Sequence, residues 1–341
     1  MNQLQKHLSA SLIAMAALLA AAPMAASAAT VPALGAASGF SALSTGSAVP
    51  PSTAADATAA LTTTGSAITG NVGSAGAVTL TGSVITGNLV YTGALANTGS
   101  TITGTSTQPL PVQVITDFNT AYGQYAAIPC TGTLLPAYTG ATLTLAPGVY
   151  CSDAAVTFTN STLTLDLTAN GGGDGSGVWI FKIGTLGTGA LTGTNFTVNM
   201  ANGGNPCNVS WWVAEASTMT TSGFQGNILA GSAITLTGLA GTTTPFNGDI
   251  MAKAGVTITD VTVIGCNGSS SNGSGSCNGG NDNGNNGHEW KHCNQGVGNG
   301  PEGCDPGNSN LHNPFRSHDD KRSNDESGGN PGDPGRKGGD R

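Results

Sequence analysis

The sequence predicts an all-β chain that folds as a β-solenoid, with one α-helix packed alongside and a disordered C-terminal tail. Three observations carry this prediction. Short segments in which aliphatic residues alternate with polar ones recur up to Cys266. Some of these segments are near-copies of one another. After Cys266 the composition changes to Gly, Ser and Asn, which bury too little apolar surface to offset the entropy of ordering a chain.

Residues 1–28 have the pattern of a secretory signal peptide. Lys6 and His7 form a short polar start, a run of small and apolar residues follows from Ser9 to Ala22, and Ala26-Ser27-Ala28 fits the cleavage pattern. The apolar run is shorter than the roughly 20 residues that a membrane-spanning helix needs. We therefore expect cleavage before Ala29 rather than an uncleaved anchor, with secretion to the extracellular space and no membrane span afterwards.

Between residues 29 and 266 the alternation predicts strands. Successive side chains of a strand point to opposite faces, so the pattern gives one aliphatic face and one face rich in threonine. The apolar members of the clearest segments are Leu163, Leu165 and Leu167; Phe196, Val198 and Met200; Val209, Trp211 and Val213; Ile234 and Leu236; and Val256 and Ile258.

The near-copies favour a solenoid over other all-β folds. The segment Ile-Thr-Gly-Asn begins at Ile68 and again at Ile85, and two further segments that resemble each other begin at Gly226 and Gly248. Rungs of about 20 residues are typical of a solenoid in which each coil stacks on the next. A β-sandwich also has short alternating strands, but it does not require near-copies of a rung.

One segment has a helical pattern instead. Its apolar residues recur four apart and form one stripe, and a proline stands just beyond its end. We expect a helix over about residues 112–127, with this stripe against the flank of the solenoid. The stripe consists of Val114, Ile115, Phe118, Tyr122 and Tyr125, and the proline is Pro129.

The body from Ala29 to Cys266 is nearly free of charge. Only 8% of the chain is charged, against about 25% in a typical soluble domain, and the body has two lysines, Lys182 and Lys253, and no arginine. A nucleic-acid-binding protein needs a basic face, so nucleic acid is excluded as a partner. A polysaccharide lyase or hydrolase needs clustered carboxylates. The body's eight acids are scattered singly and it holds no histidine, so we predict no enzyme activity.

The seven cysteines leave at least one unpaired or in an intermolecular bond. In the tail, residues 267–341, a His-x-x-x-His spacing resembles zinc sites, but no Cys-x-x-Cys accompanies it. Oxidation of Cys293 with Cys304 is the simpler interpretation, and we predict no metal and no cofactor. The residues weighed for that site are His288, His292, Cys293, Cys304, His312 and His318; Cys277 is the remaining tail cysteine.

Specific motifs stand in a fixed order along the body. They are Leu34-Gly35-Ala36-Ala37, Leu-Ala-Pro-Gly-Val-Tyr at 145–150, Val-Trp-Ile-Phe-Lys-Ile at 178–183, Cys-Asn-Val-Ser-Trp-Trp-Val at 207–213, and the rungs at Gly226 and Gly248. Over nearly all of residues 34–266 they resemble the microbial ice-binding-protein-like family of antifreeze proteins. The resemblance implies a right-handed, discontinuous β-solenoid of triangular section, with disulfides Cys130–Cys151 and Cys207–Cys266. It assigns residues 29–266 as one domain, and we expect a monomer.

Ice-active members of that family bind ice through one flat solenoid face, so the resemblance implies antifreeze or ice recrystallisation inhibition activity. Outward threonines on stacked strands would repeat every 4.7–4.9 Å across the strands and about 6.5–7 Å along them, close to oxygen spacings in ice. Threonine is stiff at χ1, so such an array is ordered before binding. The candidate ice-binding residues are Thr192, Thr194, Thr218, Thr220, Thr235, Thr237, Thr257 and Thr259.

An alternative stays open. Lys253 and Asp260 flank the segment with Thr257 and Thr259 and would disturb a neutral face, and Asp249 stands where the family commonly has arginine. A secreted or cell-surface adhesion or matrix protein of the same fold, without ice activity, would apply the same neutral face to another extracellular surface.

Overall fold

A computed structural model describes residues 30–46, 55–173, 176–241 and 244–266. The predicted signal peptide and the tail, with Cys277, Cys293 and Cys304, lie outside the described residues.

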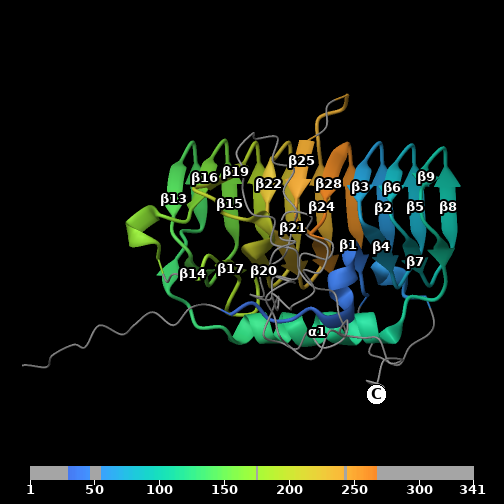
Figure 1. The fold of residues 1–341 in the computed structure, drawn as a ribbon, viewed down its shortest axis with the longest axis horizontal. Coiled ribbons are helices and arrows are strands. Elements are labelled where there is room, and N and C mark those ends of the chain that lie inside the picture. The colour runs from blue at the N-terminus through green and yellow to red at the C-terminus, as the bar shows by residue number, and fades with distance from the viewer. Residues whose placement is uncertain (1–29, 47–54, 174–175, 242–243, 267–341) are drawn as a thin grey trace, which may run out of the picture. The chain divides into compact units, whose positions relative to one another are not determined.

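The described strands form a β-solenoid in which each coil passes through three parallel sheets, as Figure 1 shows. The fold class predicted from the sequence is therefore confirmed. The two Ile-Thr-Gly-Asn segments occupy equivalent places on neighbouring coils, because Ile68 and Ile85 are register partners. Their spacing in the sequence is thus the length of one coil near the N-terminus.

The first side is a nine-stranded sheet. In spatial order its strands are β12 (Ala137–Thr139), β15 (Val156–Thr159), β18 (Leu191–Thr194), β21 (Ser217–Thr220), β24 (Ile234–Thr237), β27 (Val256–Thr259), β2 (Leu61–Thr64), β5 (Val78–Thr81) and β8 (Leu95–Thr98).

The second side is a ten-stranded sheet. Its strands are β10 (Ser106–Thr107), β7 (Leu89–Tyr91), β4 (Asn71–Ser74), β1 (Phe40–Ser44), β26 (Ile250–Ala252), β23 (Asn227–Ala230), β20 (Val209–Val213), β17 (Trp179–Ile183), β14 (Gly148–Ser152) and β11 (Gly132–Thr133).

The third side is divided between a six-stranded and a three-stranded sheet. The six strands are β22 (Phe224–Gln225), β25 (Thr244–Asn247), β28 (Val261–Ile264), β3 (Ala67–Thr69), β6 (Val84–Thr86) and β9 (Thr101–Ile102). The three are β13 (Thr142–Leu145), β16 (Thr162–Asp166) and β19 (Thr197–Ala201). Short 3₁₀ helices connect some elements: η1 (Gly35–Gly39), η2 (Ala57–Ala59), η3 (Ala169–Gly171) and η4 (Pro206–Asn208).

The stack is discontinuous in sequence, as the resemblance implied. The first coil, made by β1, β2 and β3, stacks on the last coil of the chain, made by β26, β27 and β28. In Figure 1 the orange strands of that last coil lie beside the blue strands of the first. We call this contact between β1–β3 and β26–β28 the junction.

Helix α1 (Val112–Ala127) has the bounds expected from its apolar stripe and connects the two parts of the stack along the flank of the solenoid. Its stripe is buried against the outer face of the ten-stranded sheet. Polar tips of this interface are paired: the Tyr122 hydroxyl donates to the Val213 carbonyl at 2.8 Å, and the Trp212 indole N–H donates to the Tyr122 carbonyl at 3.0 Å.

The interior between the sheets is filled by aliphatic columns and by stacked aromatic rings. Tyr138 lies 4.9 Å from Phe158 and Phe181 lies 3.9 Å from Trp211, measured between ring centroids. Side chains at equivalent positions of successive coils meet face to face, because parallel in-register strands bring them within one strand spacing.

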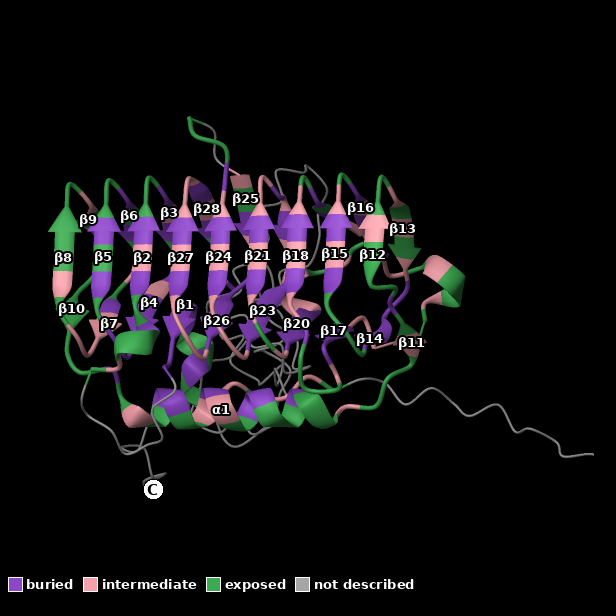
Figure 2. Ribbon diagram, turned by 180° about the vertical axis from the view of Figure 1, so that it is seen from behind, coloured by how far each residue is buried: buried purple, intermediate pink, exposed green. Residues whose placement is uncertain are grey.

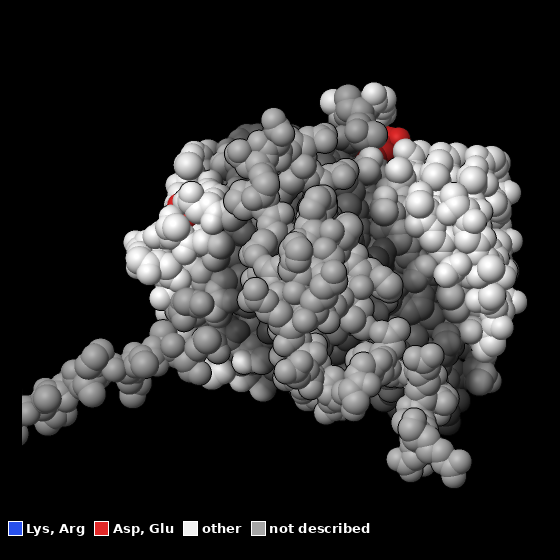
Figure 3. All heavy atoms as spheres, viewed as in Figure 1, with Lys and Arg blue, Asp and Glu red and all other residues white. Residues whose placement is uncertain are grey.

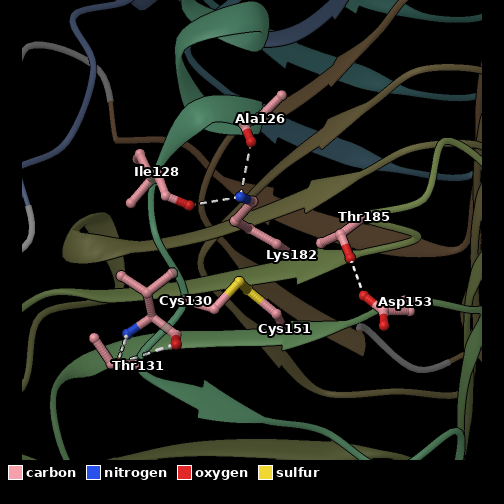
Figure 4. Close-up of a disulfide and its surroundings, with 9 residues drawn as sticks. Ala126, Ile128, Cys130, Thr131, Cys151, Asp153, Lys182 and Thr185 are labelled. Atoms are coloured by element: carbon pink, nitrogen blue, oxygen red, sulfur yellow. Dashed lines mark hydrogen bonds between the residues drawn. A yellow bond between two sulfur atoms is a disulfide. The ribbon is translucent and has the colours of Figure 1, made fainter.

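Two disulfides connect cysteines in the described part of the chain. Cys130 is bonded to Cys151, beside the end of α1, and Cys207 is bonded to Cys266, the last described residue. These are the pairings that the resemblance implied. Figure 4 shows Cys130–Cys151 next to the Lys182 ammonium, which donates to the carbonyls of Ala126 at 2.8 Å and Ile128 at 2.6 Å. A cation at this place satisfies carbonyls that a helix end leaves unpaired.

Candidate functional site

The outer face of the nine-stranded sheet carries two columns of threonine, which we call the threonine face. Along each strand the buried residues alternate with outward ones, and the outward positions two apart line up from strand to strand. Figure 2 views this sheet face on and shows the repeated banding of buried and partly exposed positions. Sixteen of the eighteen outward positions are threonine.

One column is interrupted only at its ends and the other is complete. The first runs Ala137, Thr157, Thr192, Thr218, Thr235, Thr257, Thr62, Thr79 and Ala96. The second runs Thr139, Thr159, Thr194, Thr220, Thr237, Thr259, Thr64, Thr81 and Thr98.

All eight threonines singled out from the sequence lie on this face, on the four neighbouring strands β18, β21, β24 and β27. These candidates do not include the other eight threonines of the face. Six of these carry the same signal, threonine at i and i+2, at 62 and 64, 79 and 81, and 157 and 159. Thr98 and Thr139 could not be found in this way, because the partner two residues before each is alanine.

The geometry of the face follows from the strand ladders. Nine in-register strands at about 4.8 Å spacing give columns roughly 38 Å long, and residues two apart on a strand separate the columns by about 6.5–7 Å. The outward threonines lie over buried residues such as Ile234, Leu236 and Ile258, which fix the backbone beneath them. The array is therefore held in place before any ligand arrives.

The chain turns sharply directly after the second column. Eight of the nine residues that follow its threonines have positive φ, between 48° and 64°. Glycine, asparagine and aspartate tolerate this left-handed conformation, and Asn160, Asn195 and Asp260 are three such residues. The Asn195 amide donates to the Asn160 side-chain oxygen at 3.0 Å, which ties neighbouring coils at the edge of the face.

Charge is absent from the threonine face itself. No charged residue occupies any of the eighteen outward positions. Lys182 lies against the end of α1, and Lys253 stands over the Tyr122 ring, 4.1 Å from its centroid, so both cations point to the helix. Burial lowers the pKa of each. The expected disturbance by Lys253 is thus avoided, and Asp260 lies at the corner, beside the columns.

The other outer faces are less regular. The ten-stranded sheet is covered in part by α1. The six-stranded sheet exposes Pro245, Val84 and Ile264 beside threonine and amide residues. In the view of Figure 3, from the side opposite to Figure 2, the visible described atoms include two small acidic spots and no basic ones.

Neither a metal site nor a membrane span is seen in the described part of the chain. Among residues 30–46, 55–173, 176–241 and 244–266, no group of three or more His, Cys, Asp or Glu side chains is placed to hold a metal ion. Within the same ranges no helix has both the length and the apolar character needed to cross a membrane.

Comparison with known families decides the affiliation. The sequence profile of the family described as Ice-binding-like matches residues 55–265, which is more than half of the chain. The chain belongs to the Ice-binding-like family. The match includes every strand of the threonine face, from β2 to β27.

Solved structures of ice-binding proteins are similar to this member of the Ice-binding-like family. One, from the Antarctic ascomycete Antarctomyces psychrotrophicus, is 28% identical, with a TM-score of 0.48, and the alignment covers 68% of this chain and 97% of that one. Another, from an Antarctic bacterium of the Flavobacteriaceae, is 29% identical, with a TM-score of 0.48; 68% of this chain aligns with 47% of that chain, about half its length. A search of curated proteins found no match.

Proposed function

We propose that this protein is secreted and adsorbs to ice through the threonine face. The observation that carries the proposal is the pair of in-register columns, with threonine at sixteen of eighteen outward positions and no charge among them. Membership of the Ice-binding-like family supports it.

The physical argument concerns water. Each threonine presents a methyl group and a hydroxyl in a nearly fixed orientation, because its χ1 is stiff. A regular array of such groups holds a water layer with a spacing near that of ice, and this layer merges with the crystal. Charged groups would bind water in their own geometry, and the two lysines of the body instead contact the helix.

Growth of single ice crystals in the presence of the purified chain tests the proposal. We expect faceted crystals and a gap between the melting and freezing temperatures, measured in a nanolitre osmometer. Round crystals and no gap at high protein concentration would contradict it and would leave the adhesion function, on another extracellular surface, as the alternative.

The alanines at the two ends of the first column provide a gain-of-function prediction. Ala96 and Ala137 are exposed and stand in register with Thr79 and Thr157. Replacing both with threonine makes all eighteen positions threonine, so we expect a small increase in the freezing gap at equal concentration. Thr62→Ala, at the seventh of the nine positions of the same column, is the matched control and should lower the gap. A double variant no better than the original chain would show that the end coils do not contact ice.

A further inference from the structure

The junction holds two buried hydroxyl groups that lack a hydrogen-bond partner. Three buried side-chain oxygens among the described residues have no hydrogen-bond partner, namely those of Ser41, Thr63 and Ser217. Ser41 lies on β1 and Thr63 on β2, so two of the three are at the junction. A buried hydroxyl without a partner destabilises the structure that encloses it.

A buried carboxyl lies at the same place. Asp249, directly before β26, is 4% exposed, and its Oδ1 accepts the backbone N–H of Cys266 at 2.8 Å. Gly265 stands between this carboxyl and β1: a Cβ there would lie 3.0 Å from Asp249 Oδ1 and would overlap Ser41 Oγ. The carboxyl, the unpaired hydroxyl and the end of the last strand therefore meet at one point.

Other coils place a neutral amide at this corner. Asn71, Asn88 and Asn227 each follow a glycine, as Asp249 does. Their side-chain oxygens accept a backbone N–H from the next coil, from Asn88 at 2.9 Å, Thr105 at 2.9 Å and Asp249 at 2.8 Å respectively. A protonated carboxyl has nearly the shape and polarity of that amide, whereas an ionised one adds a buried charge.

Among the described residues, no opposite charge beside Asp249 compensates its ionised form. The elements around the carboxyl are β23, β1 and the end of the described chain, which present Asn227, Ser41 and the disulfide-bonded Cys266, and none of these titrates. Lys253, beyond the far end of β26, contacts Tyr122 instead. Burial raises the pKa of Asp249 to about 7, against the smaller opposing effect of the Cys266 hydrogen bond.

We propose that ionisation of Asp249 opens the junction and so divides the nine-stranded sheet between β27 and β2. Six strands would then remain on one side and three on the other, and each threonine column would be broken between Thr257 and Thr62 and between Thr259 and Thr64. The loss of ice activity that this implies rests on the proposed function; the opening itself does not.

The direction of the pH effect follows from proton linkage. The closed junction holds the Asp249 proton more tightly than the open one, where the pKa is near its ordinary value of 3.8. The stabilisation of the closed junction by protonated Asp249 is therefore fully present below that ordinary value and is lost as the pH rises to about 7. One pKa unit corresponds to a tenfold change, so between about pH 5 and pH 8.5 opening should become about a hundredfold more favourable.

Hydrogen exchange of the full chain, read by mass spectrometry, tests the proposal. Protection factors, corrected for the intrinsic pH dependence of exchange, are compared at the two pH values for peptides from β1 and β26–β28, with β16 and β19 as the internal reference. We expect protection to fall about a hundredfold at the junction and to stay unchanged in the reference. Equal protection at both pH values would overturn the proposal.

Three variants distinguish the effect of the Asp249 charge from a general change in the stability of the fold. Asp249→Asn restores the amide of the other corners and should keep the junction protected at both pH values, while Asp153→Asn, at an exposed position, should behave as the unmodified chain. Thr63→Val removes an unpaired hydroxyl and should raise the protection of the junction equally at both pH values. If Asp249→Asn kept the full pH dependence, the assignment to Asp249 would be wrong. Absence of ice activity at every pH, with the exchange result intact, would reject only the proposed function.

Discussion

Thr235→Tyr is expected to reduce the freezing gap by about tenfold or more at equal protein concentration. Thr235 lies on β24, the fifth of the nine strands, with four strands on either side. A tyrosine ring there projects beyond the methyl and hydroxyl groups of the columns and holds a flat crystal away from its neighbours. Substitutions at the centre of a rigid, fully desolvated interface have the largest effects on binding.

The matched control is Thr86→Tyr. Thr86 is an exposed outward residue of β6 on the six-stranded sheet. The Thr86→Tyr variant therefore makes the same chemical change on a different side of the solenoid. We expect its freezing gap and crystal habit to equal those of the unmodified chain, with unchanged circular dichroism in both variants. Equal loss in the two variants, or no loss in Thr235→Tyr, would remove the threonine face from consideration.

Much of this fold was open to prediction from local pattern. The period of two in segments such as 234–237 and 256–259 predicted strands with one apolar face, and the four-residue spacing of Val114, Phe118 and Tyr122 predicted α1. These signals are strong because burial on one side of an element imposes a period on the sequence itself.

The order of the coils could not be predicted from local pattern. That β2 pairs with both β5 and β27 depends on contacts between residues far apart in the chain, such as Leu61 and Val256, which no short-range period records. The resemblance to a discontinuous solenoid implied such an arrangement without the register. This register places the threonines at 62 and 64 beside those at 257 and 259. The full length of the threonine face therefore could not be predicted from the sequence.

The positions of the charged side chains in space could not be predicted from the sequence either. Lys253 stands close to the Thr257 strand in sequence, but the chain turns between β26 and β27 and the ammonium lies over Tyr122, on the helix. Asp249 is, in the sequence alone, a simple departure from the family pattern. Its burial beside Ser41 depends on β1 packing against β26, a contact that only the three-dimensional structure reveals.

The largest effect on stability is expected from Trp211→Ala. Trp211 is fully buried on β20, stacks on Phe181, lies 5.0 Å from the Phe224 ring, and donates its indole N–H to the Gln225 carbonyl at 3.1 Å. Truncation leaves a large cavity and an unpaired carbonyl, and such changes destabilise by about 3–5 kcal/mol. For a domain of this size the melting temperature should fall by about 10 °C, measured by thermal unfolding.

Trp211→Phe keeps a ring against Phe181 and loses the N–H, so it should fall between the alanine variant and the unmodified chain. A melting temperature for Trp211→Ala within about 2 °C of the original would contradict the packing argument.

Because Trp211 lies inside the solenoid, the folded alanine variant should still form both columns near the freezing point. Its freezing gap should then remain close to that of the unmodified chain. Thr235→Tyr should show the reverse, a normal melting temperature with little ice activity, because its side chain lies on the surface and supports no other coil.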